Sequence, residues 1–244
     1  TERGLATVFR ICGRDDSQPG VAAAFVAGLG GKKIAILHDK TTSGKESADA
    51  FRKALASRGP SEVLYDGVTK GQKVYSGLIA RIKASGAELV YWGGGPAEAG
   101  LIVKQMRDQG LKTAMLASDA IASDEFAAVG GDAVEGTYMT FPPDPRERPQ
   151  AAKVVQEFKA RGIDPETYTL YAYAAVEVIK QAADTAHSLD PMAIAQAMHS
   201  GMHFTTVLGD IAFDAKGDAT RPDFVMFVWK KGPDGKIGYY PIKP

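Results

Sequence analysis

The sequence has a single cysteine, no surplus of charge and no long apolar run. Cys12 alone excludes an internal disulfide and a cysteine-based zinc cluster, and it fits a cytosolic protein as well as a periplasmic one. The 29 basic and 29 acidic residues cancel, which argues against nucleic acid or an anionic membrane as the main partner. No stretch approaches the roughly 18 apolar residues of a membrane-spanning helix. The opening segment TERGLATVFR is not a signal peptide.

Groups that carry catalysis or bind metals are also scarce. The sequence has four histidines, His38, His187, His199 and His203, and none has a ligand spacing such as HExxH. There is no GxSxG motif, and the segment DAKGD is too short for a calcium loop and lacks the closing glutamate. The sequence therefore predicts no catalytic residues, no metal and no cofactor.

What the sequence does have is a regular alternation of strand and helix patterns. Strands are predicted at 32–39, 62–68, 88–94 and 113–119, and helices at 43–59, 74–86 and 97–110. Gly59, Gly86 and Gly110 stand where these helices should end, as expected for left-handed C-caps. Strands that alternate with helices of this length predict an α/β fold with a parallel sheet covered on both faces.

The pattern changes near residue 137. A strand-like segment EGTYMTF and the proline-rich segment PPDPRERP lead into three predicted helices, at 150–162, about 168–189 and 190–201. Asp190 and Pro191 are suited to the N-cap and first position of the last helix. A strand and turn at 208–218 follow, and FVMFVWK with a GPDGK hairpin turn closes the sequence. So many helices with so few strands indicate that the strands that should pack against them lie outside this chain.

Two loops resemble phosphate-binding loops but lack residues that the phosphate-binding motifs require. In the glycine run that starts at Gly93, the sixth position of the dinucleotide fingerprint is Glu98 rather than glycine. In DKTTSGKES, Asp39 replaces the first P-loop glycine and Glu46 replaces the magnesium-binding hydroxyl. Nucleotide binding is therefore disfavoured at both loops.

The loops at the carboxyl ends of the predicted parallel strands remain, where open sheets bind their ligands. They comprise residues 38–43, 93–96 and 118–120. Ser43 and Gly95 are small and would leave this edge open, while Asp119 is a lone carboxylate just past a strand. From the sequence alone, Asp119 is either a helix cap or loop acid, or a ligand acceptor.

The order of segments resembles a known family. FRICGRDD, KKIAILHDKTTSGKE, LVYWGGGPAEAGLIVKQMRDQGLK and LGDIAFDAKGD look like the periplasmic branched-chain amino-acid-binding proteins, across essentially all 244 residues. The resemblance implies the type I periplasmic binding fold, an α/β fold of two doubly wound lobes with parallel sheets. The second lobe would comprise 13–136 and 223–244. Residues 1–12 and 137–222 would form an incomplete first lobe, whose opening part and signal peptide would precede Thr1.

The resemblance also implies a function. Members of this family are periplasmic solute receptors of ABC importers. They close by hinge motion on an amino acid, or on a relative such as γ-aminobutyrate, and deliver it to a membrane permease. The alternative is a ligand-sensing module of a regulator built on the same fold, which a neighbouring regulator gene would favour. An enzyme of the doubly wound class ranks last, and detectable turnover would revive it.

Two residues match an acidic and an aromatic position of the family, and a third lies where the chain first crosses between the lobes. Asp119 matches the acidic position that accepts the ligand's α-ammonium group, and Tyr168 matches an aromatic position that lines the pocket from the first lobe. Asp15 lies at the first crossing between lobes, where it would approach the cleft mouth or serve a structural turn. The resemblance therefore places Asp119 and Tyr168 on opposite sides of one ligand.

Three small residues are expected to leave room for a ligand, and two of them depart from the pattern of the family. Ser43 falls where many relatives have tyrosine, and Gly95 where they have tyrosine or a bulky aliphatic residue, which favours a ligand longer or bulkier than leucine. Gly94 and Gly95 are interpreted as backbone that approaches an organic ligand closely. The alternative is a plain strand-to-helix turn, in which glycine is common.

Overall fold

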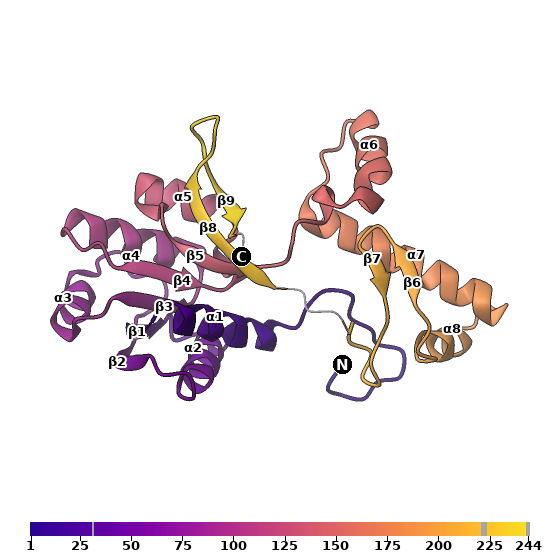
Figure 1. Cartoon of the computed structure of the whole chain (residues 1–244), viewed down its shortest axis with the longest axis horizontal. Helices are drawn as coiled ribbons and strands as arrows, with labels where there is room; N and C mark the ends of the chain where they lie inside the picture. The colour runs from indigo at the N-terminus through magenta and orange to yellow at the C-terminus, as the bar shows by residue number, and fades with distance from the viewer. Residues whose placement is uncertain (31, 221–223, 243–244) are drawn as a thin grey trace. The chain divides into compact units, whose positions relative to one another are not determined.

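The structure, a computed structural model, describes residues 1–30, 32–220 and 224–242 and divides the chain into two compact units (Figure 1). Unit 1 consists of Thr1–Arg14 and Pro142–Asp223, and unit 2 of Asp15–Phe141 and Phe224–Pro244. The domain boundary expected at 136–137 thus falls after Phe141, because residues 138–141 form a strand of the unit 2 sheet. The boundary expected at 222–223 lies outside the described residues.

Unit 2 contains a seven-stranded sheet with the order β2-β1-β3-β4-β5-β8-β9. Its strands are β1 (Lys33–His38), β2 (Ser61–Gly67), β3 (Leu89–Gly93), β4 (Ala114–Ala117), β5 (Tyr138–Phe141), β8 (Val225–Lys231) and β9 (Ile237–Pro241). The first five strands in that order are parallel, and β8 and β9 add an antiparallel edge. The mostly parallel α/β sheet predicted from the sequence is confirmed.

Helices cover both faces of this sheet (Figure 1). They are α1 (Gln18–Gly28), α2 (Thr42–Leu55), α3 (Ser76–Ser85), α4 (Pro96–Asp108) and α5 (Asp124–Gly130), with 3-10 turns at η1 (Asp15–Ser17), η2 (Asp119–Ile121) and η3 (Gly131–Val134). Along β1, Ile34 and Ile36 pack with α1 and α2, whereas Ala35 and Leu37 pack with α3 and α4. Burial on both faces explains why the sequences of the central strands β1 and β3 are almost continuously apolar.

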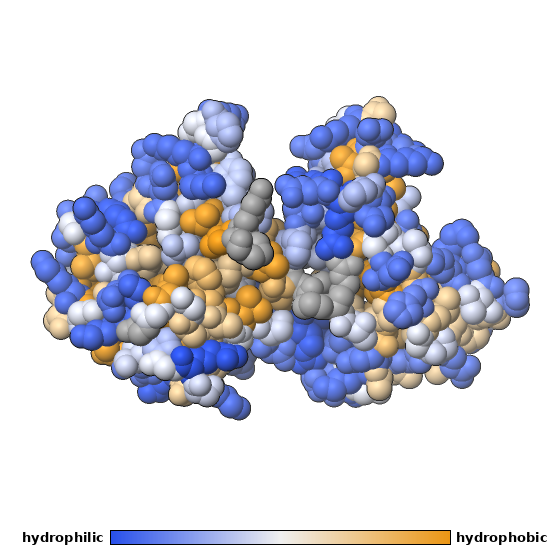
Figure 2. Space-filling model, viewed as in Figure 1, coloured by the Kyte–Doolittle hydropathy of each residue, from blue (hydrophilic) through white to orange (hydrophobic). Residues whose placement is uncertain are grey.

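Unit 1 contains α6 (Ala152–Ala160), α7 (Thr167–Ala186), α8 (Pro191–Met198), the two-stranded sheet of β6 (Phe204–Thr206) and β7 (Gly209–Ile211), and the turns η4 (Pro145–Glu147) and η5 (Pro149–Ala151). Leu170, Val178 and Phe204 are central to its core. Asp190 caps α8 and Pro191 opens it, as predicted. Figure 2 shows apolar side chains at the surface of this unit. Val176 and Ile179 of α7 are among its exposed apolar residues.

The register of the parallel strands places three loops at one edge of the sheet. His38 at the end of β1 lies beside Gly93 of β3, and Trp92 of β3 lies beside Ala117 of β4. The loops that follow these strands therefore emerge together, at the edge where open α/β sheets hold ligands.

Candidate ligand-binding site

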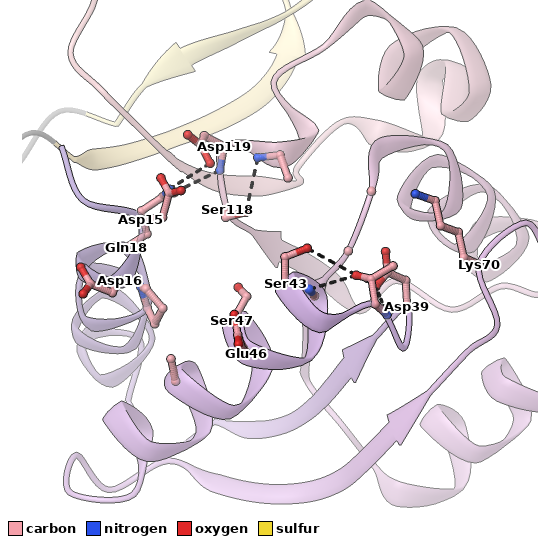
Figure 3. A pocket seen from close by; sticks show the side chains of 17 residues that line it. Asp15, Asp16, Gln18, Asp39, Ser43, Glu46, Ser47, Lys70, Ser118 and Asp119 are labelled. Atoms are coloured by element: carbon pink, nitrogen blue, oxygen red, sulfur yellow. Dashed lines mark hydrogen bonds between the residues drawn. The ribbon is translucent and has the colours of Figure 1, made fainter. Parts of the chain in front are cut away.

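A cavity of about 590 Å³ opens at this edge, within unit 2. The first turns of α1 and α2 and the loops after β1, β3 and β4 surround it (Figure 3). Its lining contains five carboxylates, Asp15, Asp16, Asp39, Glu46 and Asp119, and Lys70 is the only basic side chain in that lining. The described part of the cavity is therefore strongly acidic.

Asp119 is held in place by Gln18. Ser118 caps the η2 turn by accepting a hydrogen bond from the Ala120 N–H at 3.3 Å, so Asp119 is not the cap of this turn. The Gln18 Nε2 donates to Asp119 Oδ1 at 2.9 Å, and the Asp119 N–H donates to Gln18 Oε1 at 3.1 Å. Buried Ile121 anchors the other end of the turn in the core. Gln18 thus fixes the Asp119 carboxylate at the cavity lining, and Ser118 and Ile121 fix the turn that carries it.

Helix N-termini close to the cavity stabilise the negative charge of its acidic lining. The first turns of α1 and α2 contribute Gln18, Ser43 and Gly44 to the cavity lining, and Gly95 is the N-cap of α4. The positive ends of helix dipoles favour negative charge nearby. At the N-terminus of α2 this negative charge is the Asp39 carboxylate. It accepts hydrogen bonds from the Thr41 N–H at 3.0 Å and from the Thr41 Oγ1 at 2.6 Å. With carboxylates already at these positions, the cavity suits a cationic group better than a phosphate.

The glycines after β3 serve two different purposes. A Cβ on Gly94 would lie 2.5 Å from the Trp92 ring and 2.9 Å from the Asp39 Cβ, so close packing of the turn requires glycine there. The Trp92 Nε1 closes the same turn by donating to the Gly95 carbonyl at 3.0 Å. A Cβ on Gly95 would meet only the Glu98 Oε2, at 3.3 Å. The turn interpretation accounts for Gly94, whereas Gly95 leaves open space at the cavity.

Two further predicted residues lie in the same lining. Ser43 is exposed in the first turn of α2, with its Oγ 3.5 Å from the Thr41 Oγ1. Asp15 opens the η1 turn and its Oδ1 accepts from Gln18 Nε2 at 3.5 Å. The cavity therefore brings together Asp15, Ser43 and Asp119 with the glycines 94 and 95.

Tyr168 is in unit 1 and is not among the residues that line this cavity. It belongs to the first turn of α7, which a capping box fixes through the Glu166 N–H donating to Thr169 Oγ1 at 3.1 Å. The residue is 51% exposed, and its ring centroid lies 5.8 Å from that of Tyr171. The role of Tyr168 at the ligand stays a prediction.

His38, the histidine nearest the cavity, has a structural role. Burial lowers its pKa, with the positive charge of Lys45 acting in the same direction. A neutral ring leaves Nδ1 free to accept the Lys40 N–H, which lies 3.1 Å away. In the residues that the structure describes, no group of three or more His, Cys, Asp or Glu side chains is placed to hold a metal ion.

Comparison with known proteins places the chain in a family. The family model described as "Periplasmic binding protein" matches residues 2–235. The Leu/Ile/Val-binding protein homolog 1 of Brucella suis biovar 1 is 50% identical over 240 residues, covering 98% of this chain and 65% of that protein. An amino acid binding protein of Pseudomonas aeruginosa is 44% identical, covering 94% of this chain and 62% of its own length. The chain belongs to the periplasmic binding protein family.

Solved structures show the same fold. A leucine binding protein from Thermotoga maritima superposes with a TM-score of 0.78 at 24% identity, covering 96% of this chain and 67% of that chain. An ABC transporter substrate-binding protein from Desulfitobacterium hafniense, in complex with Leu, gives a TM-score of 0.76 at 21% identity, covering 98% and 69%. The type I periplasmic binding fold is therefore confirmed, and this chain spans about 65% of the length of the Brucella suis and Brucella melitensis Leu/Ile/Val-binding protein homologues.

These relatives are binding proteins and not enzymes, which sets aside the interpretation as a doubly wound enzyme. None of the helices in the described ranges is long and apolar enough to span a membrane.

Proposed function

We propose that this chain forms the larger part of a solute receptor that binds an amino acid or a related amine-bearing molecule. The ligand's ammonium group binds the Asp119 carboxylate in the unit 2 cavity. Tyr168 contributes apolar contact from unit 1, and a hinge motion of the two units closes the receptor on its ligand. One relative named for leucine, isoleucine and valine binding and another named for amino acid binding support this class of ligand.

The acidic cavity beside a fixed carboxylate is the observation that carries the proposal. A charge-assisted hydrogen bond from an ammonium to Asp119 would contribute about 1.5–3 kcal/mol to binding. The cavity volume of about 590 Å³ lies within the range of roughly 300–1,000 Å³ that small-molecule sites occupy. The space left by Ser43 and Gly95 favours a ligand with more bulk than leucine.

The same proposal includes a membrane permease as the partner and the periplasm as the location. A receptor of this family delivers its ligand to a membrane permease of an ABC importer, and it does so in the periplasm. We extend both statements to this chain because the family model covers residues 2–235 of it.

The test is a titration of the chain with a panel of amino acids and amines that includes L-leucine and γ-aminobutyrate. We expect at least one ligand to bind, and Asp119→Ala to weaken that ligand about 10- to 100-fold, as the loss of a charge-assisted hydrogen bond requires. Calorimetry measures tight ligands, and ¹⁵N–¹H NMR extends the measurement into the millimolar range.

Asp132→Ala is the matched control. Asp132 lies in the η3 turn of the same unit, outside the cavity lining, and its side chain pairs with Lys231 at 3.0 Å. This variant should bind as the wild type does. Unchanged affinity in Asp119→Ala for every ligand that binds would contradict the role given to Asp119.

A further inference from the structure

Gln18 stands at the centre of a hydrogen-bond network beside the cavity. It is the first residue of α1, and its side chain is almost completely buried, with 2% of the residue exposed. Two of its partners belong to segments far away in the sequence, Asp119 after β4 and Thr140 in β5, and the nearby Asp15 Oδ1 also accepts from its Nε2 at 3.5 Å. Figure 3 shows Gln18 directed toward Asp119.

The network fixes which way the Gln18 amide faces. Oε1 accepts two hydrogen bonds, from the Thr140 Oγ1 at 2.6 Å and from the Asp119 N–H at 3.1 Å. Both groups are donors toward Oε1, so a flipped amide would set its NH₂ group against the backbone N–H. The Nε2 therefore faces Asp119 and donates to its Oδ1 at 2.9 Å.

A donor fixed in this way restricts the Asp119 carboxylate. The side chain of an aspartate has two rotatable bonds, and a free carboxylate at a cavity wall would sample several orientations. Gln18 binds the backbone N–H and the carboxylate of the same residue, so it sets the position and the direction of the negative charge together. Preorganisation of this kind improves affinity because less freedom is lost when the ligand binds.

We propose that Gln18 is a positioning residue of the ligand site, which holds the Asp119 carboxylate in the orientation that accepts the ligand's ammonium group. This inference rests on the proposed function. It assigns to Gln18 a role through Asp119, in addition to its contribution to the packing of α1 against β5.

Gln105 offers a matched comparison for a purely structural glutamine. Its Oε1 accepts from the Tyr75 N–H at 2.8 Å and its Nε2 donates to the Lys73 carbonyl at 2.8 Å. It thus joins two segments of unit 2 with the same chemistry as Gln18, yet it is not part of the cavity lining.

The first experiment compares Gln18→Met with Gln105→Met in titrations with L-leucine and γ-aminobutyrate. Methionine keeps the length of the side chain and removes both the oxygen and the nitrogen of the amide group. We expect Gln18→Met to weaken the ligand that binds the wild type by about 10-fold, the size of one hydrogen bond to a charged group. Gln105→Met should bind like the wild type, even where urea unfolding shows a comparable loss of stability.

Gln18→Glu adds a readout that a structural role would not change. At pH 8 the new carboxylate faces the Asp119 carboxylate, with the Asp15 carboxylate also close to it, and repulsion displaces the Asp119 carboxylate, so binding should be weak. As the pH falls toward 5, one proton is shared by the pair, as in other close carboxylate dyads. The protonated group then donates to Asp119 in place of the amide, and affinity should recover, whereas Gln18→Met stays weak across the same range.

Three outcomes overturn part or all of this account. If the wild type binds and Gln18→Met binds equally well, the positioning role is wrong while the proposed function stands. If Gln18→Glu shows no recovery relative to Gln18→Met at low pH, the positioning role is also wrong. If the wild type binds neither the named ligands nor any other amine of the panel, the proposed function fails, and the role of Gln18 falls with it.

Discussion

Gly44 lies where the first turn of α2 meets the end of β3. A Cβ at this position would sit 2.7 Å from the Gly93 carbonyl oxygen and would also collide with the Asp39 carboxylate. We expect Gly44→Ala to lower the free energy of unfolding by about 1–3 kcal/mol, because the backbone must shift to make room. It should also weaken ligand binding, because Asp39 lines the cavity.

Gly77→Ala is the control for Gly44→Ala. Gly77 lies in α3, and a Cβ there would approach only Arg81 Nη1, at 3.8 Å. Alanine favours helix over glycine by about 0.5–1 kcal/mol, so this variant should be as stable as the wild type or more stable. Urea unfolding measures both variants, and equal stability for Gly44→Ala would contradict the packing argument.

Asp218 in unit 1 is nearly buried among cationic and hydroxyl groups. Burial on its own would raise the pKa of Asp218, but hydrogen bonds from Arg14 and Thr1 and the charges of Arg10 and Arg14 lower it. Arg14 Nη1 and Thr1 Oγ1 each lie 2.8 Å from the carboxylate. These contacts connect the N-terminal segment with the segment before β8.

The lowered pKa of Asp218 predicts a pH dependence of stability. An aspartate in the unfolded chain titrates near roughly 3.9, so a carboxylate with a lower pKa when folded stabilises the protein above that pH. The stabilisation is lost as the pH falls through the folded-state value. Asp218→Asn should be less stable than the wild type at pH 7, and the difference should shrink below about pH 4. A difference that is constant from pH 7 to pH 3 would contradict this account.

Some single residues of the site could be predicted from the sequence and others could not. Asp119, Ser43 and Gly95 could be predicted because they directly follow predicted strands or open a helix, and strand ends converge in a parallel sheet. Gln18 neither follows a predicted strand nor opens a predicted helix, so no sequence pattern indicated it. Its partners Asp119 and Thr140 lie 101 and 122 residues away along the chain, and no local pattern reports a contact of that kind.

At the scale of elements, α8 depends on its cap. The Asp190 Oδ1 accepts from the N–H groups of Met192 and Ala193, at 2.9 and 3.0 Å. Because α8 is a short helix of eight residues, it depends strongly on this cap. We expect Asp190→Ala to destabilise α8 by about 1 kcal/mol.

Amide hydrogen exchange measures this effect locally. Protection should fall in residues 191–198 of Asp190→Ala, while the strands of unit 2 keep their protection. Asp190→Ser retains a capping oxygen and should restore most of the protection. Equal protection in wild type and Asp190→Ala would show that packing against the core, and not the cap, holds this helix.

The predicted strands of unit 2 matched the structure because each is an apolar run bounded by glycine or polar residues. Two helices carried no comparable pattern. The sequence of α1, QPGVAAAFVAG, is almost uniformly small and apolar and so lacks a polar face, although Ala22, Ala23 and Val26 are buried in the core. The other, α5, has only seven residues. The antiparallel pairing of β8 with β5 is a long-range contact that local pattern does not reveal.

At the scale of the whole molecule, the surface of unit 1 includes exposed apolar side chains on α7 and an apolar groove. Val176 and Ile179 on α7 are 66% and 50% exposed. Ile179 also lines an apolar groove of about 360 Å³ together with Phe9 and Met198. Contiguous exposed apolar surface of this kind promotes association.

We therefore expect the chain to self-associate as its concentration rises, and Val176→Lys with Ile179→Lys to reduce that association. Sedimentation velocity over a concentration series measures the effect. Val74→Lys in unit 2 is the control, because Val74 is 67% exposed but does not line this groove. Association that is unaffected by the double substitution would show that another surface is responsible.

The central claim is that an amine-bearing ligand binds in the unit 2 cavity at Asp119. The most direct measurement is a ¹⁵N–¹H NMR titration of the chain with the same panel of amino acids and amines, which includes L-leucine, γ-aminobutyrate and amino acids bulkier than leucine. We predict saturable shifts of the Asp119 and Gly95 backbone amides and of the Gln18 side-chain amide, and their loss in Asp119→Ala. Shifts confined to unit 1, or shifts at the cavity that persist in Asp119→Ala, would contradict the account.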